Sequence, residues 1–261
     1  MKWITCLNEN TPLHSIYEEM LKVAVLSCKK FTDLEPIFIY DGKQNSLTRW
    51  MEKKGVTVLF QESSLKSQIE SISQKEKNPF LTHVGCGAFL RVDIPEIAVR
   101  HNWKDNFVFY TDCDVMFVGD VEKNLDFKEC ELFSVAPEDE PNQIDIINTG
   151  SMLMNVTNLI KCDKKFKKFI RKNLSEFLSA AWDQTAYIKY FNKQWSYLKP
   201  TLNWKPYWGY NSDVKLVHFH GLKPHHRKAI INGELEDSFE RMVSDGFFKY
   251  CKIYDDYRFC D

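Results

Sequence analysis

The first hundred residues alternate between short runs of strand-forming residues and longer stretches with helical periodicity. The runs Trp3–Leu7, Pro36–Tyr40 and Val56–Phe60 are rich in β-branched and aromatic side chains, and a polar residue follows each of them. Between the runs, apolar residues recur every three or four positions, as at Ile16 and Met20. Strands that alternate with helices build βαβ units and a parallel sheet. We therefore expect an α/β protein.

The pattern continues along the chain, with one polar interruption. The expected elements are a helix over Phe80–Arg91, a second helix after Pro95, strands over Asn106–Tyr110, Glu131–Ala136 and Gly150–Val156, and a helix from Leu159 to Phe177. The segment Gln61–Asn78 is polar and has few apolar anchors, so we expect a flexible excursion there. Because the sequence shows no internal repeat and no Gly/Ser linker, we expect one domain over residues 1–224 and a C-terminal extension over residues 225–261.

Composition excludes several classes of protein. Hydrophobic residues make up 44% of the 261 residues, enough to bury a core, so the chain is not intrinsically disordered. Lys and Arg number 35 against 36 Asp and Glu, a net charge of −1 that leaves no basic excess for binding nucleic acid. The sequence contains no membrane span and no long apolar signal region at its start. We therefore expect a cytoplasmic protein whose eight scattered cysteines are reduced, with Cys251 and Cys260 placed to close a loop in an oxidising compartment.

An acidic pair at the end of an apolar strand is the most informative point of the sequence. The run Asn106–Tyr110 ends at Thr111, after which Asp112 and Asp114 interrupt an otherwise apolar segment. Open α/β sheets bind ligands at the carboxyl ends of their strands. Two carboxylates placed there without a cation repel each other at considerable cost. The pair therefore indicates a divalent metal site, against the alternative of a solvated acidic turn.

A late strand, Val214–Phe219, offers a third metal ligand in His218. An imidazole nitrogen suits a borderline cation such as Mn²⁺. Gly221 and Lys223 follow, and no acidic residue occurs between positions 215 and 233. A glycine lets the backbone approach a phosphate, and a lysine neutralises its charge. This stretch therefore indicates a pyrophosphate site.

Five parts of the sequence occur in an order typical of one enzyme family. They are Leu7–Asn10; Ala88–Arg91 with Ile94–Glu96; Tyr110–Asp114 with Val118–Asp120; Asn148–Gly150 and Met152–Asn155 with Trp182–Gln184; and His218–Pro224. In this order they resemble the motifs of the retaining glycosyltransferases of family 8, the group of glycogenin and the bacterial lipooligosaccharide galactosyltransferases. The resemblance covers residues 3 to about 224. It implies the GT-A fold, a mixed and mostly parallel central sheet flanked by helices.

The resemblance also implies the ligands of the site. It implies a UDP-sugar donor and Mn²⁺, with Mg²⁺ as the alternative, held by Asp112, Asp114 and His218. Asp114, Asp183 and Gln184 take the catalytic positions. The donor-binding positions it implies are Leu7, Asn8, Asn10, Arg91, Asp112, Cys113, Asp145, Asn148, Gly221 and Lys223. The implied reaction is the transfer of a hexose-type sugar to a glycan, a lipid-linked saccharide or a protein.

In the family, the residue at the position of Gln184 lies close to the anomeric carbon and bears on the stereochemistry of the reaction. A neutral amide is a poor nucleophile, so the resemblance implies retention by internal return and not a covalent intermediate. Two positions depart from the family. Only Leu222 separates Gly221 from Lys223, where the family has two residues, and Ala180 stands where some members carry a second acid. The sequence therefore leaves the transferred sugar open.

Two other functions remain as alternatives at this stage. A haloacid-dehalogenase-like phosphatase also has Asp-x-Asp after a strand, but near the N-terminus, and its later acidic pair is matched here only by Asp255–Asp256. A non-catalytic nucleotide-sugar sensor or metal-binding module is the second alternative. Such a module usually lacks one acidic metal ligand, whereas this chain has both Asp112 and Asp114.

Two surfaces outside the motifs have open interpretations. The helix expected over Leu159–Phe177 carries a basic face, which is either simply solvated or contacts an anionic membrane or an acidic partner. The basic residues are Lys164, Lys165, Lys167, Lys168, Arg171 and Lys172. The aromatic C-terminus, with rings from Phe247 to Phe259, packs back on the domain, packs on a second subunit of a homodimer, or makes a peripheral contact with the inner face of a membrane.

Overall fold

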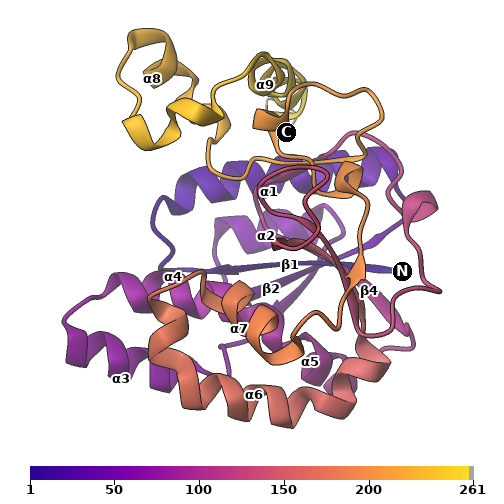
Figure 1. Cartoon of the computed structure of the whole chain (residues 1–261), viewed down its shortest axis with the longest axis vertical. Helices are drawn as coiled ribbons and strands as arrows, with labels where there is room; N and C mark the ends of the chain where they lie inside the picture. Colours follow the sequence, from indigo (N-terminus) through magenta and orange to yellow (C-terminus); the bar gives the residue numbers. More distant parts are fainter. Residues whose placement is uncertain (259–261) are drawn as a thin grey trace.

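A seven-stranded sheet with helices on both faces organises the computed structural model, which describes residues 1–258 (Figure 1). Its strands are β1 (Lys2–Asn8), β2 (Glu35–Asp41), β3 (Thr57–Phe60), β4 (Phe107–Thr111), β6 (Phe133–Pro137), β7 (Ile147–Asn155) and β8 (Ser196–Tyr197). They lie in the order β3-β2-β1-β4-β7-β6-β8. Strands β1 to β4 are mutually parallel, β7 runs antiparallel to β4 and β6, and β8 is parallel to β6. The predicted α/β class is confirmed.

Helices cover the two faces of the sheet in separate groups (Figure 1). The α-helices of the described residues are α1 (His14–Phe31), α2 (Ser46–Lys53), α3 (Lys66–Glu76), α4 (Phe80–Ala88), α5 (Ile94–Arg100), α6 (Val156–Leu178), α7 (Trp182–Phe191), α8 (Arg227–Asn232) and α9 (Asp245–Arg258). Helices α1 and α2 lie on one face, and α3 to α7 lie on the other. Alternate residues of β1 serve the two layers: Ile4 and Cys6 pack toward α3–α7, and Trp3 and Leu7 pack toward α1 and α2.

The strand order creates a crevice at the carboxyl end of β1. Strand β1 pairs with β2 on one side and with β4 on the other, so the chain winds away from it in both directions. Ligands of open α/β sheets bind at such a switch point. A small second sheet lies beside it, in which β5 (Val115–Phe117) runs antiparallel to β9 (Leu216–His218) and Val115 is paired with His218. This pairing brings the end of β9 next to the loop that follows β4.

The expectation of a flexible excursion over Gln61–Asn78 is wrong. Helix α3 occupies Lys66–Glu76 within it. Leu65, Ile69 and Ser73 are buried at intervals of four residues, so a single narrow stripe faces the core. Few apolar anchors are therefore enough here, because helical spacing places them on one face.

Three other predicted boundaries shift. Strand β7 begins at Ile147, three residues before the predicted start, and α6 begins at Val156. The helix predicted over Phe80–Arg91 breaks after Ala88 into a 3₁₀ turn, η1 (Phe89–Asp93), which contains Arg91. This turn matters for the site because it directs Arg91 toward the crevice.

The C-terminal helix α9 packs on α1, opposite the sheet. Phe247, Tyr250 and Tyr254 are at most 1% exposed, so these rings pack back on the chain itself. Phe259 and Cys260 lie outside the described residues, so the proposed Cys251–Cys260 bridge is untested. The seven cysteines within residues 1–258 form no disulfide with one another. None of the helices within residues 1–258 combines the length and the apolar character needed to cross a membrane.

Candidate functional site

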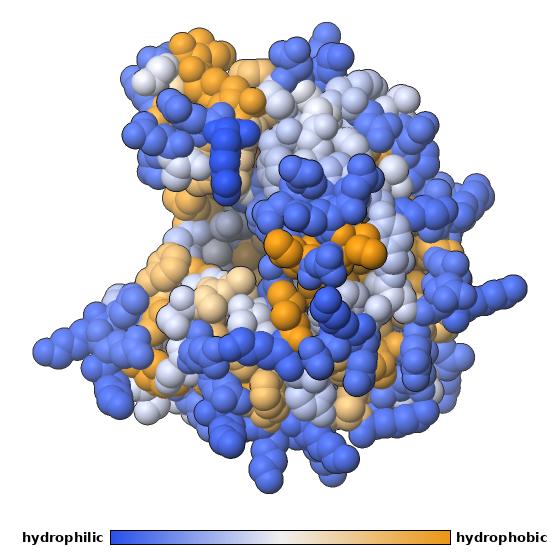
Figure 2. All heavy atoms as spheres, viewed as in Figure 1, coloured by the Kyte–Doolittle hydropathy of each residue, from blue (hydrophilic) through white to orange (hydrophobic). Residues whose placement is uncertain are grey.

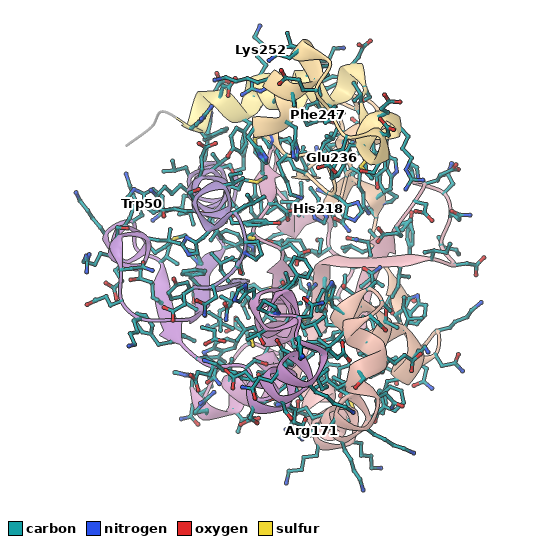
Figure 3. All side chains as sticks on the ribbon, turned by 90° about the vertical axis from the view of Figure 1, so that its left-hand side faces the viewer. Trp50, Arg171, His218, Glu236, Phe247 and Lys252 are labelled. Atoms are coloured by element: carbon teal, nitrogen blue, oxygen red, sulfur yellow. The ribbon has the colours of Figure 1, made fainter. Side chains whose placement is uncertain are left out.

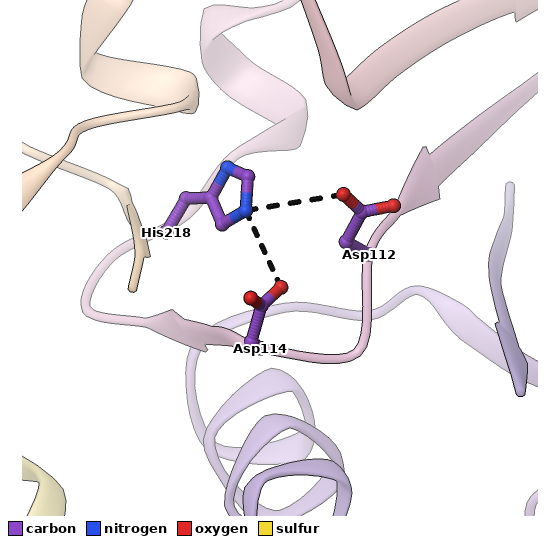
Figure 4. A group of neighbouring side chains, drawn as sticks. All are labelled: Asp112, Asp114 and His218. Carbon is purple, nitrogen blue, oxygen red and sulfur yellow. Dashed lines mark ion pairs between the residues drawn. The ribbon is translucent and has the colours of Figure 1, made fainter. Parts of the chain in front are cut away.

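The three predicted metal ligands come together at the crevice (Figure 4). Asp112 follows β4, Asp114 precedes β5, and His218 ends β9. One ligand atom from each of the three lies within 4.8 Å of the others. His218 Nε2 is 3.3 Å from Asp114 Oδ1 and 3.9 Å from Asp112 Oδ2. The predicted cluster is confirmed as a geometric arrangement of two carboxylates and one imidazole.

Hydrogen bonds fix the orientation of the imidazole. Asn203 Nδ2 donates to Asn148 Oδ1 at 2.8 Å, and Asn148 Oδ1 also accepts the backbone N–H of Gly150 at 3.0 Å. The amide oxygen of Asn203 therefore faces His218, whose Nδ1 lies 2.8 Å away. Because that oxygen only accepts, Nδ1 carries a proton, so that Nε2 would offer its lone pair to a metal ion bound between the two aspartates. This is the tautomer that a metal ligand requires.

Gly150 makes room for the same ring. A Cβ at this position would lie 2.2 Å from His218 Cε1 and 2.8 Å from Asn148 Oδ1. No side chain fits there without moving the imidazole. The glycine of the Asn-Thr-Gly segment is thus explained by packing of β7 against the histidine.

Lys223 contacts the cluster directly. Its Nζ lies 2.5 Å from Asp114 Oδ2 and donates to the carbonyl of Phe219 at 2.7 Å. Burial alone would raise the pKa of Asp114, but Lys223 and His218 hold it well below its usual range. Gly221 supports this turn with a φ of 75°, and a Cβ there would meet Met242 Sδ at 2.2 Å. The tight spacing from Gly221 to Lys223 therefore places the ammonium against Asp114, a predicted metal ligand.

Arg91 links the cluster to the predicted catalytic acid. Its guanidinium lies 3.0 Å from Asp112 Oδ1 and 2.7 Å from Asp183 Oδ2, and it donates to the carbonyl of Thr149. The guanidinium also lies over the ring of Tyr110, whose hydroxyl donates to Asp112 Oδ1 at 2.8 Å. Arg91 is 6% exposed. Arg91 is therefore a buried cation that contacts two carboxylates.

Asp183 begins α7 in an apolar setting. Burial raises the pKa of its carboxyl to about 7, although Arg91 opposes the shift. Within residues 1–258, Asp183 Oδ2 has no aligned hydrogen-bond partner, because its close approach to Arg91 Nε has poor hydrogen-bond geometry. An acceptor atom left in this way can receive a hydrogen bond from a ligand hydroxyl.

Gln184 is held at both ends of its amide. Its Oε1 accepts the backbone N–H of Thr149 at 3.0 Å, and its Nε2 donates to Glu138 Oε2 at 3.3 Å. The same carboxylate oxygen accepts Asn148 Nδ2 at 2.6 Å. The predicted residues Asn148 and Gln184 are thus brought together through Glu138.

Glu138 is a site residue that the sequence interpretation missed. It follows β6 at the same edge of the sheet, and its Oε1 lies 3.1 Å from His220 Nε2. Burial lowers the pKa of His220 to about 4, with Glu138 opposing, so the ring is neutral and donates from Nε2. Its Nδ1 then accepts from the hydroxyl of Tyr207 at 3.2 Å. The only signal in the sequence was an acid directly after a strand, in the loop at positions 137–145.

A pocket beside the cluster contains four of the ten predicted donor positions, Leu7, Arg91, Asp112 and Cys113. Its walls are formed by Cys6, Leu7, Thr11, Tyr17, Val84, Gly87, Ala88, Arg91, Tyr110, Asp112, Cys113 and Asp114. Figure 2 shows the molecule hollowed between its C-terminal part and the α4–α7 side. Asn8 is buried next to the pocket, where it donates to Asp41 at 2.9 Å and accepts the backbone N–H of Asn10 at 2.7 Å. Asn10 itself is exposed.

Asp145 is the predicted donor contact that the structure does not bring to the cluster. Its side chain is 79% exposed and pairs with Lys193 at 3.3 Å. The reason is local: β7 begins only at Ile147, so Asp145 lies in the surface loop before the strand. Glu138, at the other end of that loop, is the acid that turns inward.

Comparisons with known proteins bear on the fold. The sequence matches no protein-family model and no curated protein. Solved structures are similar: the glycosyltransferase GlyE of Streptococcus pneumoniae TIGR4 has a TM-score of 0.67 at 14% identity, over 100% of this chain and 61% of that one. The galactosyltransferase LgtC, in complex with donor and acceptor sugar analogs, has a TM-score of 0.62 at 15% identity, over 93% of this chain and 100% of that one.

A third similar structure is mouse xyloside xylosyltransferase 1, with a TM-score of 0.56 at 11% identity, over 84% of this chain and 97% of that one. The chain thus spans 61% of the length of GlyE. At these identities the likeness concerns the fold alone. The chain has the GT-A fold of glycosyltransferases.

Proposed function

We propose that the protein is a metal-dependent glycosyltransferase that moves a hexose-type sugar from a UDP-sugar to a glycan, a lipid-linked saccharide or a protein, with retention of configuration. The observation that carries the proposal is the Asp112–Asp114–His218 cluster at the switch point of a GT-A fold. Arg91 connects it to Asp183, and Glu138 connects Gln184 to the same interior network. Nucleotide binding, metal binding and sugar chemistry would then share one crevice.

The residues present fit a divalent cation. Two carboxylates and an imidazole that faces them with Nε2 form a mixed oxygen and nitrogen donor set. Such a set favours Mn²⁺ over Mg²⁺, which prefers oxygen ligands and bound water. When bound, the cation would supply Lewis-acid stabilisation of the charge on a departing diphosphate.

Lys223 is the cation of the site that a phosphate can engage. Arg91 is already paired with two carboxylates, whereas Lys223 contacts Asp114 alone among acids. A metal ion bound by Asp112 and Asp114 would neutralise both carboxylates and free the ammonium of Lys223 for phosphate oxygens. The backbone turn at Gly221 keeps Lys223 close to the cluster.

In this proposal Asp183 and Gln184, at the start of α7, act on the sugar. Gln184 Oε1 accepts two hydrogen bonds from Thr149, from the backbone N–H at 3.0 Å and from the hydroxyl at 3.4 Å. If the hydroxyl turns away, one lone pair of Oε1 can stabilise positive charge at an anomeric carbon. A held, neutral amide is a poor nucleophile, which supports retention by internal return. Asp183 Oδ2 is paired in charge with Arg91 but forms no aligned hydrogen bond, so it can accept one from a sugar hydroxyl.

The rival functions have less support. The acid Asp255, which a phosphatase would need at its metal site, is instead paired with Arg227 through two contacts of 2.5 and 2.7 Å on α9. A non-catalytic module would share the geometry of the cluster, so it is separated from an enzyme only by turnover.

Calorimetric titration with UDP, GDP, CMP and several UDP-sugars, with and without Mn²⁺, tests the proposal, followed by an assay of UDP release. We expect Mn²⁺-dependent UDP binding that is lost in Asp114→Asn and slow release of UDP from one donor. Asp213→Asn, an exposed acid before β9, is the matched control and keeps both. UDP binding without turnover of any donor or acceptor would favour the sensor, and no nucleotide binding would overturn the proposal.

A further inference from the structure

Helix α6 presents an exposed cationic face at the surface opposite α9. The face consists of Lys161, Lys164, Lys165, Lys168, Arg171 and Lys172, all exposed. At about 1.5 Å per residue it extends over roughly 16 Å of helix. Figure 3 shows long side chains tipped with nitrogen that point away from the body of the protein around Arg171.

These six cations contribute little to the fold: Lys161 donates one hydrogen bond, to Asn158 Oδ1 at 2.7 Å. None of the ion pairs formed among residues 1–258 includes any of them. Lys167, which the sequence interpretation placed on the same face, is instead 4% exposed and pairs with Asp93, Glu96 and Asp163. Asp163, the one acid in this stretch, has a side chain only 14% exposed. On α6, therefore, the cation that forms ion pairs is buried, and the cations that form no ion pair are exposed.

A groove between α3 and α6 adds neutral polar groups to this face. It is lined by Gln68, Ser71, Ile72, Arg171, Lys172, Leu174 and Ser175. Two cations, two hydroxyls and an amide meet there, and no carboxylate lines the groove. This chemistry suits the oxygen atoms of a phosphate group.

The charge is also strongly asymmetric over the molecule. The whole chain carries a net charge of −1, so outside these six residues it carries −7. An anionic surface would therefore attract this face and repel the remainder, which orients the protein. In Figure 3, Arg171 lies at one end of the long axis and His218 near the middle, so contact through α6 leaves the crevice uncovered.

We infer that the cationic face of α6 docks the protein peripherally on a membrane surface rich in anionic lipid. Five of the six cations are lysines, which act as mobile point charges and suit a diffuse layer of headgroups better than a bidentate partner. Clusters of four to eight basic residues on one helix bind such surfaces. In the aromatic C-terminus, Phe247, Tyr250 and Tyr254 are buried, so these three rings do not reach such a surface.

Sedimentation of the full chain with vesicles tests this inference. The vesicles contain either phosphatidylcholine alone or phosphatidylcholine with about 30 mol% phosphatidylglycerol. We expect binding to the anionic vesicles only, weakening steeply between about 50 and about 300 mM NaCl. The variant Lys164→Glu/Lys168→Glu/Arg171→Glu should bind about tenfold more weakly or worse, since each basic residue contributes separately.

A matched variant separates local charge from net charge. Lys53→Glu/Lys104→Glu/Lys252→Glu changes the net charge equally at exposed positions on other parts of the chain, and it should bind vesicles nearly as well as the wild type. Circular dichroism and thermal unfolding check that both variants fold. Equal weakening in the two variants, or failure of the wild type to bind anionic vesicles at low salt, would overturn the inference. Binding to heparin or RNA without binding to vesicles would overturn it too, in favour of a polyanionic macromolecule.

Discussion

Asn203 Oδ1 lies 2.8 Å from Nδ1 of His218, and this contact decides which nitrogen of the imidazole faces Asp112 and Asp114. Asn203 lies 15 residues before the histidine and is completely buried. Its own orientation is set by Asn148, to which it donates. The Asp112–Asp114–His218 cluster therefore depends on a pair of amides that lie outside it.

Removing this support should weaken metal binding. In Asn203→Ala we expect the affinity for Mn²⁺ to fall by about 10- to 100-fold, since the imidazole loses the partner that fixes its tautomer. Titration of free Mn²⁺ followed by electron paramagnetic resonance measures it. Ser151→Ala is the control, because Ser151 bonds the neighbouring carbonyl of Leu202 and not the histidine. Equal losses of affinity in the two variants would show that the amide acts only on local packing.

Lys223 stabilises Asp114 when no metal neutralises it. In Lys223→Met we expect metal-free protein to lose roughly 3 kcal/mol of its free energy of unfolding, because a buried carboxylate loses its partner. Added Mn²⁺ should restore more stability to the variant than to the wild type. Urea unfolding in EDTA and in Mn²⁺ measures both effects. Identical stabilisation by Mn²⁺ in the two proteins would contradict the idea that lysine and metal share this carboxylate.

The Lys223–Asp114 pair should also make the free energy of unfolding depend on pH. A carboxyl whose folded-state pKa is lowered contributes stability above its unfolded pKa of about 4 and loses it as the pH falls. Wild-type protein in EDTA should therefore lose stability below about pH 4 more steeply than Lys223→Met. Parallel curves of unfolding free energy against pH would show that Lys223 does not lower the pKa of Asp114.

Local patterns in the sequence were sufficient for six of the seven strands of the sheet and for the Asp112–Asp114–His218 cluster, whereas the two-residue strand β8 was not predicted. The apolar run before Asp112 marks β4, and the late strand before His218 marks β9, so both ligands are visible as residues at strand ends. Helix α3 was missed because its buried stripe is only one side chain wide. Glu138 was missed and Asp145 chosen because both are acids of one loop, and only the tertiary fold decides which of them turns inward.

Glu138 should act by positioning Gln184. In Glu138→Ala we expect kcat for sugar transfer to fall by about 10- to 100-fold, because the Gln184 amide loses one of its two anchors. The KM for the donor should change little, since the nucleotide pocket is formed by other residues. Steady-state kinetics of UDP release measure the two constants. Asp139→Ala alters the next, exposed acid and should keep wild-type values; a comparable fall in kcat there would indicate that the loop as a whole, and not Glu138, is responsible.

Asp183 should make the stability of the protein depend on pH in the opposite sense to Asp114. Burial raises its folded-state pKa to about 7, against about 3.9 in the unfolded chain. A raised pKa means that the folded state keeps a proton that the unfolded state releases. The contribution of this carboxyl to stability is therefore complete below about pH 4 and declines until about pH 7.

Asp183→Asn removes the titration and keeps the shape. The variant's free energy of unfolding, relative to wild type, should rise by on the order of 3 kcal/mol between about pH 4 and about pH 7 and then level off. Any loss of the contact with Arg91 is independent of pH over this range and shifts the whole curve. Urea unfolding of both proteins in EDTA gives the difference, with Asp213→Asn as the control for an exposed acid. Parallel curves would mean that the guanidinium of Arg91, 2.7 Å away, keeps Asp183 ionised throughout.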